Sequence, residues 1–173
     1  MEVEKFDGKI QRQILIAMIT SKEVLANIAP KWPKDGLFES KWCNIVASWC
    51  VKHWHKYSKV PGKQIQQRFD HWAERGEKET VKMVSRFLQS LSDEYKQDGE
   101  PNHAYILDLA SEHFNVSAAK KLSRELEKEI DRGKIRDALS KINTFKPVEL
   151  GQSGTVDLLT DKEAIRKVFA EKR

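Results

Sequence analysis

Residues 35–62 of the chain, DGLFESKWCNIVASWCVKHWHKYSKVPG, decide the fold. Asp35-Gly36-Leu37-Phe38 is typical of a turn that opens a helix, and the apolar residues after it recur at helical spacing as far as Tyr57. Lys59-Val60-Pro61-Gly62 stops this helix, because proline lacks the amide hydrogen and glycine favours a turn. The stretch therefore predicts one long amphipathic helix with a turn at each end.

Helical spacing also governs the apolar residues on both sides of this stretch. A stripe through Ile10, Ile14, Ala17 and Met18 ends at Ser21-Lys22-Glu23-Val24-Leu25. Two further helical faces follow, formed by Ile65, Phe69 and Trp72 and by Val81, Val84, Leu88 and Leu91. Alternation with a period of two does not occur, so the chain is predicted to be all-α. Gln97-Asp98-Gly99-Glu100-Pro101 predicts the end of a globular helical domain at residues 1–100.

Residues 102–131 contain neither proline nor glycine and predict a single helix of about 45 Å. Asn102 suits the N-cap and Gly133 the C-terminal cap, while Asn115 and Ser117 are points at which the helix could break. A shorter helix returns after Gly133, which predicts an antiparallel hairpin at residues 101–146. The two helices carry narrow apolar stripes, formed by Leu109, Val116, Ala119, Leu126 and Ile130 and by Ile135, Ala138, Leu139 and Ile142.

The last segment, residues 147–173, predicts a flexible linker and a final helix. Pro147, Gly151, Ser153 and Gly154 are typical of a linker. Thr160 or Asp161 then caps a short amphipathic helix whose apolar face comprises Ala164, Ile165, Val168 and Phe169. An isolated helix of about 12 residues is marginally stable in water. We therefore expect this helix to dock on another protein surface.

Composition and motifs exclude several kinds of function. No Gly-x-x-x-x-Gly-Lys-Ser/Thr loop occurs, so we expect no ATP hydrolysis, and we predict no catalytic, cofactor or metal site in this chain. Cys43 and Cys50 lie about 10 Å apart along one predicted helix and cannot form a disulfide together. The surrounding tryptophans should bury both thiols and raise their pKa. No apolar run reaches the roughly 18 residues that span a bilayer, so we expect a cytosolic protein without membrane partners.

Two groups of residues are candidates for weak contact with DNA, since the chain holds 31 Lys/Arg against 26 Asp/Glu. Trp54, beside Lys52 and Lys56, lies off the core stripe of its helix and is the best tryptophan for an exposed contact. The second group is the basic run Lys120, Lys121, Arg124, Lys128, Arg132, Lys134 and Arg136. Acidic residues are interleaved with this run, which favours a solvated helical face over a dedicated nucleic-acid site.

The order of these elements resembles the N-terminal domain of DnaB-type replicative DNA helicases, especially the phage versions. In that family a first helix and a short second helix precede an aromatic turn, a long helix and a "Val-Pro" turn. The resemblance covers the globular part, the hairpin and the linker with its helix. It implies a collar in a bacterial or phage-infected cell that self-associates as a dimer or hexameric ring, receives a primase and sometimes a helicase loader, and leaves ATP and Mg²⁺ to the motor of the parent helicase.

By this resemblance, seven apolar residues would hold the hairpin and its dimer contact: Leu109, Val116, Leu126, Ile130, Ile135, Leu139 and Ile142. Ile165, Val168 and Phe169 would dock the linker helix on the motor of the adjacent subunit. The chain lacks the motor, and its returning helix is short for the family. Two alternatives stay open, namely the helicase-binding domain of a primase, and a phage helicase loader or accessory protein that binds single-stranded DNA.

Overall fold

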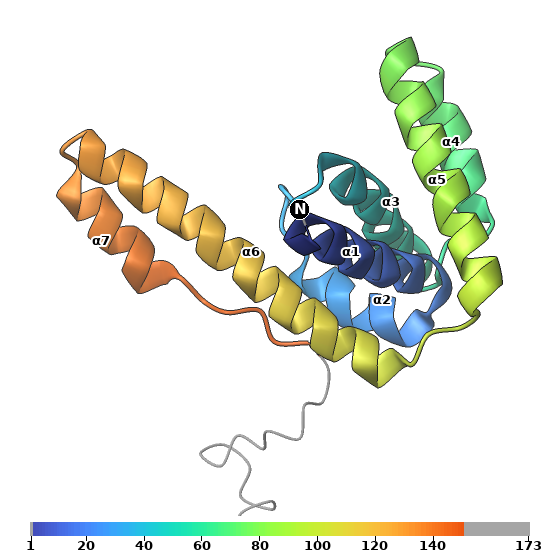
Figure 1. The fold of residues 1–173 in the computed structure, drawn as a ribbon, viewed down its shortest axis with the longest axis horizontal. Helices are drawn as coiled ribbons and strands as arrows, with labels where there is room; N and C mark the ends of the chain where they lie inside the picture. The colour runs from blue at the N-terminus through green and yellow to red at the C-terminus, as the bar shows by residue number, and fades with distance from the viewer. Residues whose placement is uncertain (1, 151–173) are drawn as a thin grey trace, which may run out of the picture.

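The computed structural model describes residues 2–150, with side chains from Gly8 onward (Figure 1). Every regular element in this range is a helix, which confirms the all-α prediction. The elements are α1 (Glu2–Thr20), α2 (Lys22–Ile28), the 3-10 helix η1 (Ala29–Lys31), α3 (Lys41–Tyr57), α4 (Gln64–Ala73), α5 (Lys78–Asp98), α6 (His103–Asp131) and α7 (Ile135–Thr144).

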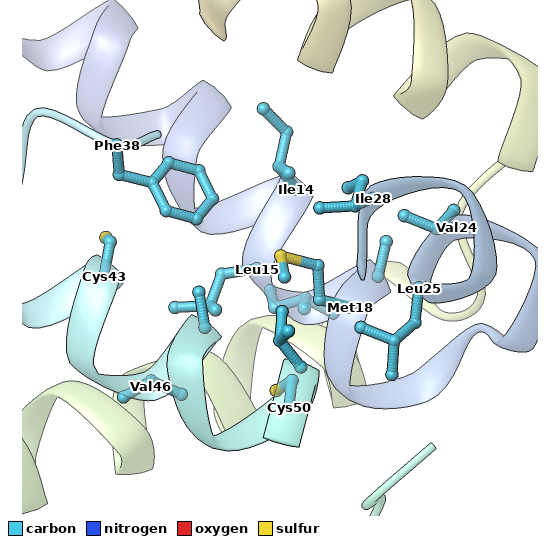
Figure 2. Close-up of a cluster of buried hydrophobic side chains, with 14 of the residues drawn as sticks. Ile14, Leu15, Met18, Val24, Leu25, Ile28, Phe38, Cys43, Val46 and Cys50 are labelled. Atoms are coloured by element: carbon cyan, nitrogen blue, oxygen red, sulfur yellow. The ribbon is translucent and has the colours of Figure 1, made fainter. Parts of the chain in front are cut away.

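The core is centred on α1, which buries consecutive residues because helices surround it. Figure 2 shows Ile14, Leu15 and Met18 from α1 meeting residues from α2 and α3. α2 starts immediately after α1, since the Ser21 hydroxyl accepts a hydrogen bond from the Val24 amide at 3.3 Å. Ser21 is thus the only residue between α1 and α2, and the chain changes direction there so that α2 packs on the same core.

The long helix α3 begins at Lys41, later than the Asp35-Gly36-Leu37-Phe38 turn suggested. Ser40 caps it, and residues 33–40 form an ordered turn instead of a first helical turn. Asn44 holds that turn, because its Oδ1 accepts from the Phe38 amide at 2.9 Å and its Nδ2 donates to the Phe38 carbonyl at 2.8 Å. Phe38 is thereby placed in the core. The helix ends at Tyr57, as predicted.

Helix α6 is continuous through Asn115 and Ser117, and its first half belongs to the same core as α1 and α2. Five of its residues are buried there: Ile106, Leu107, Ala110, His113 and Phe114. The core therefore extends beyond residue 100, past the globular region predicted at residues 1–100. Asn102 caps α6, with its Oδ1 accepting from the Tyr105 amide at 3.2 Å. Gly133 has a φ of +73°, as its predicted place at the C-terminal cap requires.

The predicted hairpin is present as α6 and α7, and its far part projects away from the helices around α1 (Figure 1). After α7 the chain runs back along α6. We call residues 146–150 the strap. Within it, the Val148 amide donates to Asn115 Oδ1 at 2.6 Å, and Asn115 Nδ2 donates to the Val148 carbonyl at 3.0 Å. The Leu150 amide donates to the Ser111 hydroxyl at 3.2 Å, and Leu150 is buried. Residues 148–150 of the predicted linker are thus held in place, and the predicted helix with Ile165, Val168 and Phe169 lies outside the described residues.

Candidate interaction surface of the hairpin

The hairpin carries large aliphatic side chains that its own packing does not cover. Ile130 is 55% exposed, Ile135 and Leu139 are each 54% exposed, and Ile142 is 50% exposed. On α7, the spacing of four and three residues puts Ile135, Leu139 and Ile142 on one side. The inward side of α7 is occupied by Ala138, which is 4% exposed. We call Leu126, Ile130, Ile135, Leu139 and Ile142 the hairpin surface.

The two helices of the hairpin are fixed to each other, so the hairpin surface is a preformed shape. The small side chain of Ala138 lets α7 approach α6 closely. Lys141 reaches back to α6, with its Nζ 3.5 Å from Glu129 Oε1 and 3.9 Å from Glu125 Oε2. Phe145, at the end of α7, closes a shallow groove together with Leu122, Leu126 and Ile130. The buried Ala138, the Phe145 contact and the ion pairs of Lys141 thus join the two helices, while Ile130, Ile135, Leu139 and Ile142 stay about half exposed.

The apolar stripe of α6 changes side halfway along the helix. Successive residues are about 100° apart around the axis, so Ile106, Ala110 and Phe114 lie on roughly the opposite side from Leu126 and Ile130. One side of α6 packs in the core, and the opposite side, farther along the helix, lies in the hairpin beside Phe145. A helix that contacts two unrelated surfaces needs two stripes.

Two of the seven predicted hairpin residues lie outside the apolar stripe of the hairpin. Leu109 is half-buried against the core, and Val116 is 47% exposed near the middle of α6. The structure therefore does not bring them together with Ile130 or Leu139. Sequence reasoning also missed Leu122 and Phe145, although each continues a stripe at helical spacing, from Leu126 and from Ile142 respectively.

The basic residues predicted to contact DNA on α6 are exposed, but their positive charge is partly neutralised. Lys120 lies 3.3 Å from Glu39. Lys121, Arg124 and Lys128 share their helix with the acidic residues Glu125, Glu127, Glu129 and Asp131. Trp54 is half-buried and packs against the core, so it presents less aromatic surface than its place off the stripe suggested.

Both cysteines are free and buried, at the centre of the α3 packing. Burial raises the pKa of the Cys43 thiol, against smaller lowering effects of Ser40 and Arg12, and it raises the pKa of the Cys50 thiol much further. Within the described residues, no group of three His, Cys, Asp or Glu side chains is placed to hold a metal ion. No helix within residues 2–150 has the length and apolar composition needed to cross a membrane.

No protein-family model matches the chain, and no curated protein or solved structure matches it either.

Proposed function

We propose that this chain is an interaction domain that pairs with a second copy of itself through the hairpin surface. The observation that carries the proposal is the set of aliphatic side chains at positions 130, 135, 139 and 142, each half exposed on a rigid hairpin. Contiguous exposed apolar residues are typical of a protein interface. Fully burying an exposed side chain of this size contributes about 1.5–3 kcal/mol, and burying the exposed half of each contributes roughly half of that, so several of them on both copies stabilise a dimer.

A second hairpin is the occupant that fits this surface best. The surface is elongated along two antiparallel helices, and two such surfaces placed face to face form a four-helix bundle with a shared core. A two-fold pairing buries the same residues on both copies. A globular partner with a convex surface would cover only part of the stripe.

Within this reading, we propose that the chain is the N-terminal collar of a DnaB-type hexameric replicative helicase. The support is the order of elements: a first helix, the short helix α2, the aromatic turn at Phe38, the long helix α3, the Val60-Pro61 turn and a hairpin. The collar would receive a primase or a helicase loader. ATP and Mg²⁺ would be bound by the motor of the parent helicase and not by this chain.

Sedimentation velocity at about 100 μM tests the self-association. We expect the wild type to be a dimer or a larger oligomer, and Leu139→Glu and Ile142→Glu to be monomers, because each buries a carboxylate in the interface. Met83→Glu is the matched control, since Met83 is 52% exposed on α5, away from the hairpin. A monomeric wild type, or equal dissociation by Met83→Glu, would contradict the proposal.

The helicase assignment is tested separately by reading the gene beyond codon 173. A Gly-x-x-x-x-Gly-Lys-Ser/Thr loop in the same reading frame would support it. If the frame encodes none, the chain should co-elute in size-exclusion chromatography with a purified DnaB-type motor or primase encoded in the same genome. If the frame encodes no such loop and the chain does not co-elute with either protein, the helicase assignment is refuted. The self-association would still be decided by sedimentation.

A further inference from the structure

The end of α3 and the turn to α4 carry positive charge that no neighbouring acidic residue in the sequence balances. Between Ser40 and Phe69 the chain has six Lys/Arg and no Asp or Glu. Four of these residues are exposed within twelve positions: Lys52, Lys56, Lys59 and Lys63. Among the side chains described, none of the four forms an ion pair, in contrast to Lys120 and Lys141.

The backbone that presents these lysines is anchored to the core. Ser58 adopts a left-handed conformation with a φ of +52° and ends α3 through a 2.8 Å hydrogen bond from its amide to the Trp54 carbonyl. Val60 and Pro61 then pack inward. The Gly62 amide donates to the Ile19 carbonyl of α1 at 3.0 Å. The lysines on either side of Val60-Pro61 therefore project from a fixed turn.

An exposed aromatic ring lies among these charges. Tyr57 is 53% exposed, and the Lys56 ammonium lies 5.1 Å from the centroid of its ring. The ring of His53 lies 4.8 Å away on the same helix. Partial burial lowers the pKa of His53, so at neutral pH this imidazole is an uncharged ring that supports Tyr57. The group thus combines aromatic rings with positive charge.

Helix stability alone does not account for this arrangement. A basic residue in the last turn of a helix is stabilised by the helix dipole, which explains Lys56. Lys59 and Lys63 lie beyond the helix and gain nothing from it. The Tyr57 ring contacts neighbours on its own helix, His53 and Lys56, and still leaves 53% of the residue exposed.

We propose that Lys52, His53, Lys56, Tyr57, Lys59 and Lys63, here called the α3-end surface, bind single-stranded nucleic acid. The lysines contact phosphates, and Tyr57 stacks on an unpaired base. Proteins that bind single strands without sequence preference combine basic grooves with aromatic rings in this way. An anionic lipid surface also attracts lysines and tyrosine rings, so binding to vesicles is measured beside binding to nucleic acid. The α3-end surface does not depend on the hairpin, so this proposal stands apart from the self-association.

Fluorescence anisotropy of a labelled dT20 oligonucleotide, titrated with the full chain at about 50 mM salt, tests the proposal. We expect a dissociation constant of roughly 1–100 μM, which is typical of binding through phosphates without sequence preference. Tyr57→Ala should weaken binding about 5- to 100-fold, the usual effect of losing one stacked base. A Lys56→Ala/Lys59→Ala double variant should lower the slope of log affinity against log salt by roughly 0.7 for each lysine.

Matched control variants test whether dT20 binding depends on the α3-end surface or only on the net positive charge of the chain. Tyr105→Ala removes a tyrosine that is 58% exposed on α6, and Lys82→Ala removes an exposed lysine of α5 that is paired with Glu79. We expect both to bind dT20 within about twofold of the wild type, since surface changes of this kind barely alter the fold.

Three results would overturn the proposal. The first is no binding of dT20 by the wild type at about 50 mM salt. The second is an equal loss of affinity in the control variants and in Tyr57→Ala. The third is binding to vesicles of anionic phospholipid as tight as binding to dT20 and equally weakened by Tyr57→Ala, which would assign the surface to a membrane.

Discussion

Phe38 joins three parts of the chain through its ring. Its centroid lies 5.7 Å from that of Trp32 and 5.2 Å from that of Phe114 on α6, so a turn residue connects η1 with the middle of α6. Asn44 fixes the backbone of this turn. The turn is tight, because a Cβ atom added to Gly36 would lie 2.2 Å from Asn44 Oδ1.

Gly36→Ala should therefore lower the free energy of unfolding more than Gly99→Ala does. Both glycines have positive φ, of +81° and +71°, so both substitutions incur backbone strain of about 1–3 kcal/mol. Only Gly36 adds the clash with Asn44, since nothing lies within 4 Å of a Cβ at Gly99. Urea denaturation of both variants measures the difference. Equal losses would mean that Asn44 moves aside without cost.

The buried thiols predict both low reactivity and a dependence of stability on pH. Burial raises the pKa of Cys43 and Cys50 in the folded state, so their contribution to stability is complete below the unfolded pKa of about 8.5 and is lost as the pH rises above it. We expect slow reaction with a thiol reagent in the native protein and fast reaction in denaturant. A Cys43→Ala/Cys50→Ala variant should lose less stability between about pH 8 and pH 10 than the wild type. An identical loss would show that other groups cause it.

At the scale of elements, the strap at residues 146–150 keeps the end of the hairpin on α6. Two hydrogen bonds between Asn115 and Val148 secure it, and the Val148 amide donates to Asn115 Oδ1. Leaving a partly buried amide unsatisfied costs about 1–3 kcal/mol. The strap therefore depends strongly on the Asn115 side chain.

Asn115→Ala should release the strap without unfolding α6. We expect faster hydrogen exchange at the Val148 and Leu150 amides, and unchanged exchange in α1 and α3. Ser117→Ala is the control, because the Ser117 hydroxyl is buried without a hydrogen-bond partner. Its removal should leave stability unchanged or slightly raise it. Unchanged exchange at Val148 in Asn115→Ala would show that the burial of Leu150 alone holds the strap.

The sequence predicts helix ends well where a cap or a turn within a few residues defines them. It predicts them less well where contacts with distant residues define them. Asn102, Gly133, Tyr57 and Lys59-Val60-Pro61-Gly62 mark ends that depend on caps and turns within a few residues. The start of α3 was placed too early, because Phe38 is drawn into the core and Ser40 supplies a better cap. The sequence predicts one continuous apolar stripe along α6, because it does not show that each half of the helix meets a different surface.

On the scale of the whole molecule, the hairpin surface and the α3-end surface lie on different elements and use different chemistry. The hairpin surface is aliphatic, and its association depends on removing apolar area from water. The α3-end surface is cationic, and its binding depends on the release of counterions. A higher salt concentration should therefore weaken binding at the α3-end surface without weakening association through the hairpin surface.

Raising the salt concentration from about 0.1 M to about 0.5 M should nearly abolish dT20 binding and leave self-association intact. Affinity for single strands falls with a log–log slope of about −0.7 for each phosphate contact, whereas apolar burial is insensitive to salt or strengthened by it. Anisotropy and sedimentation of the same samples measure both. Loss of the oligomer at high salt would mean that charged residues, and not the hairpin aliphatics, carry the self-association.

The sequence by itself determined the all-α class and the approximate ends of most of the long helices, because period, caps and turns are local properties. It also determined that α6 and α7 form a hairpin, since Gly133 can adopt the turn that joins them. Tertiary structure alone decided which apolar residues of α6 and α7 are buried and which stay in solvent. It placed the first half of α6 in the core and left Ile130 and Leu139 in solvent. It also showed that the lysines around Val60-Pro61 are unpaired and share one anchored turn with Tyr57. Burial and ion pairing depend on which distant residues come together, and no short window of sequence records that.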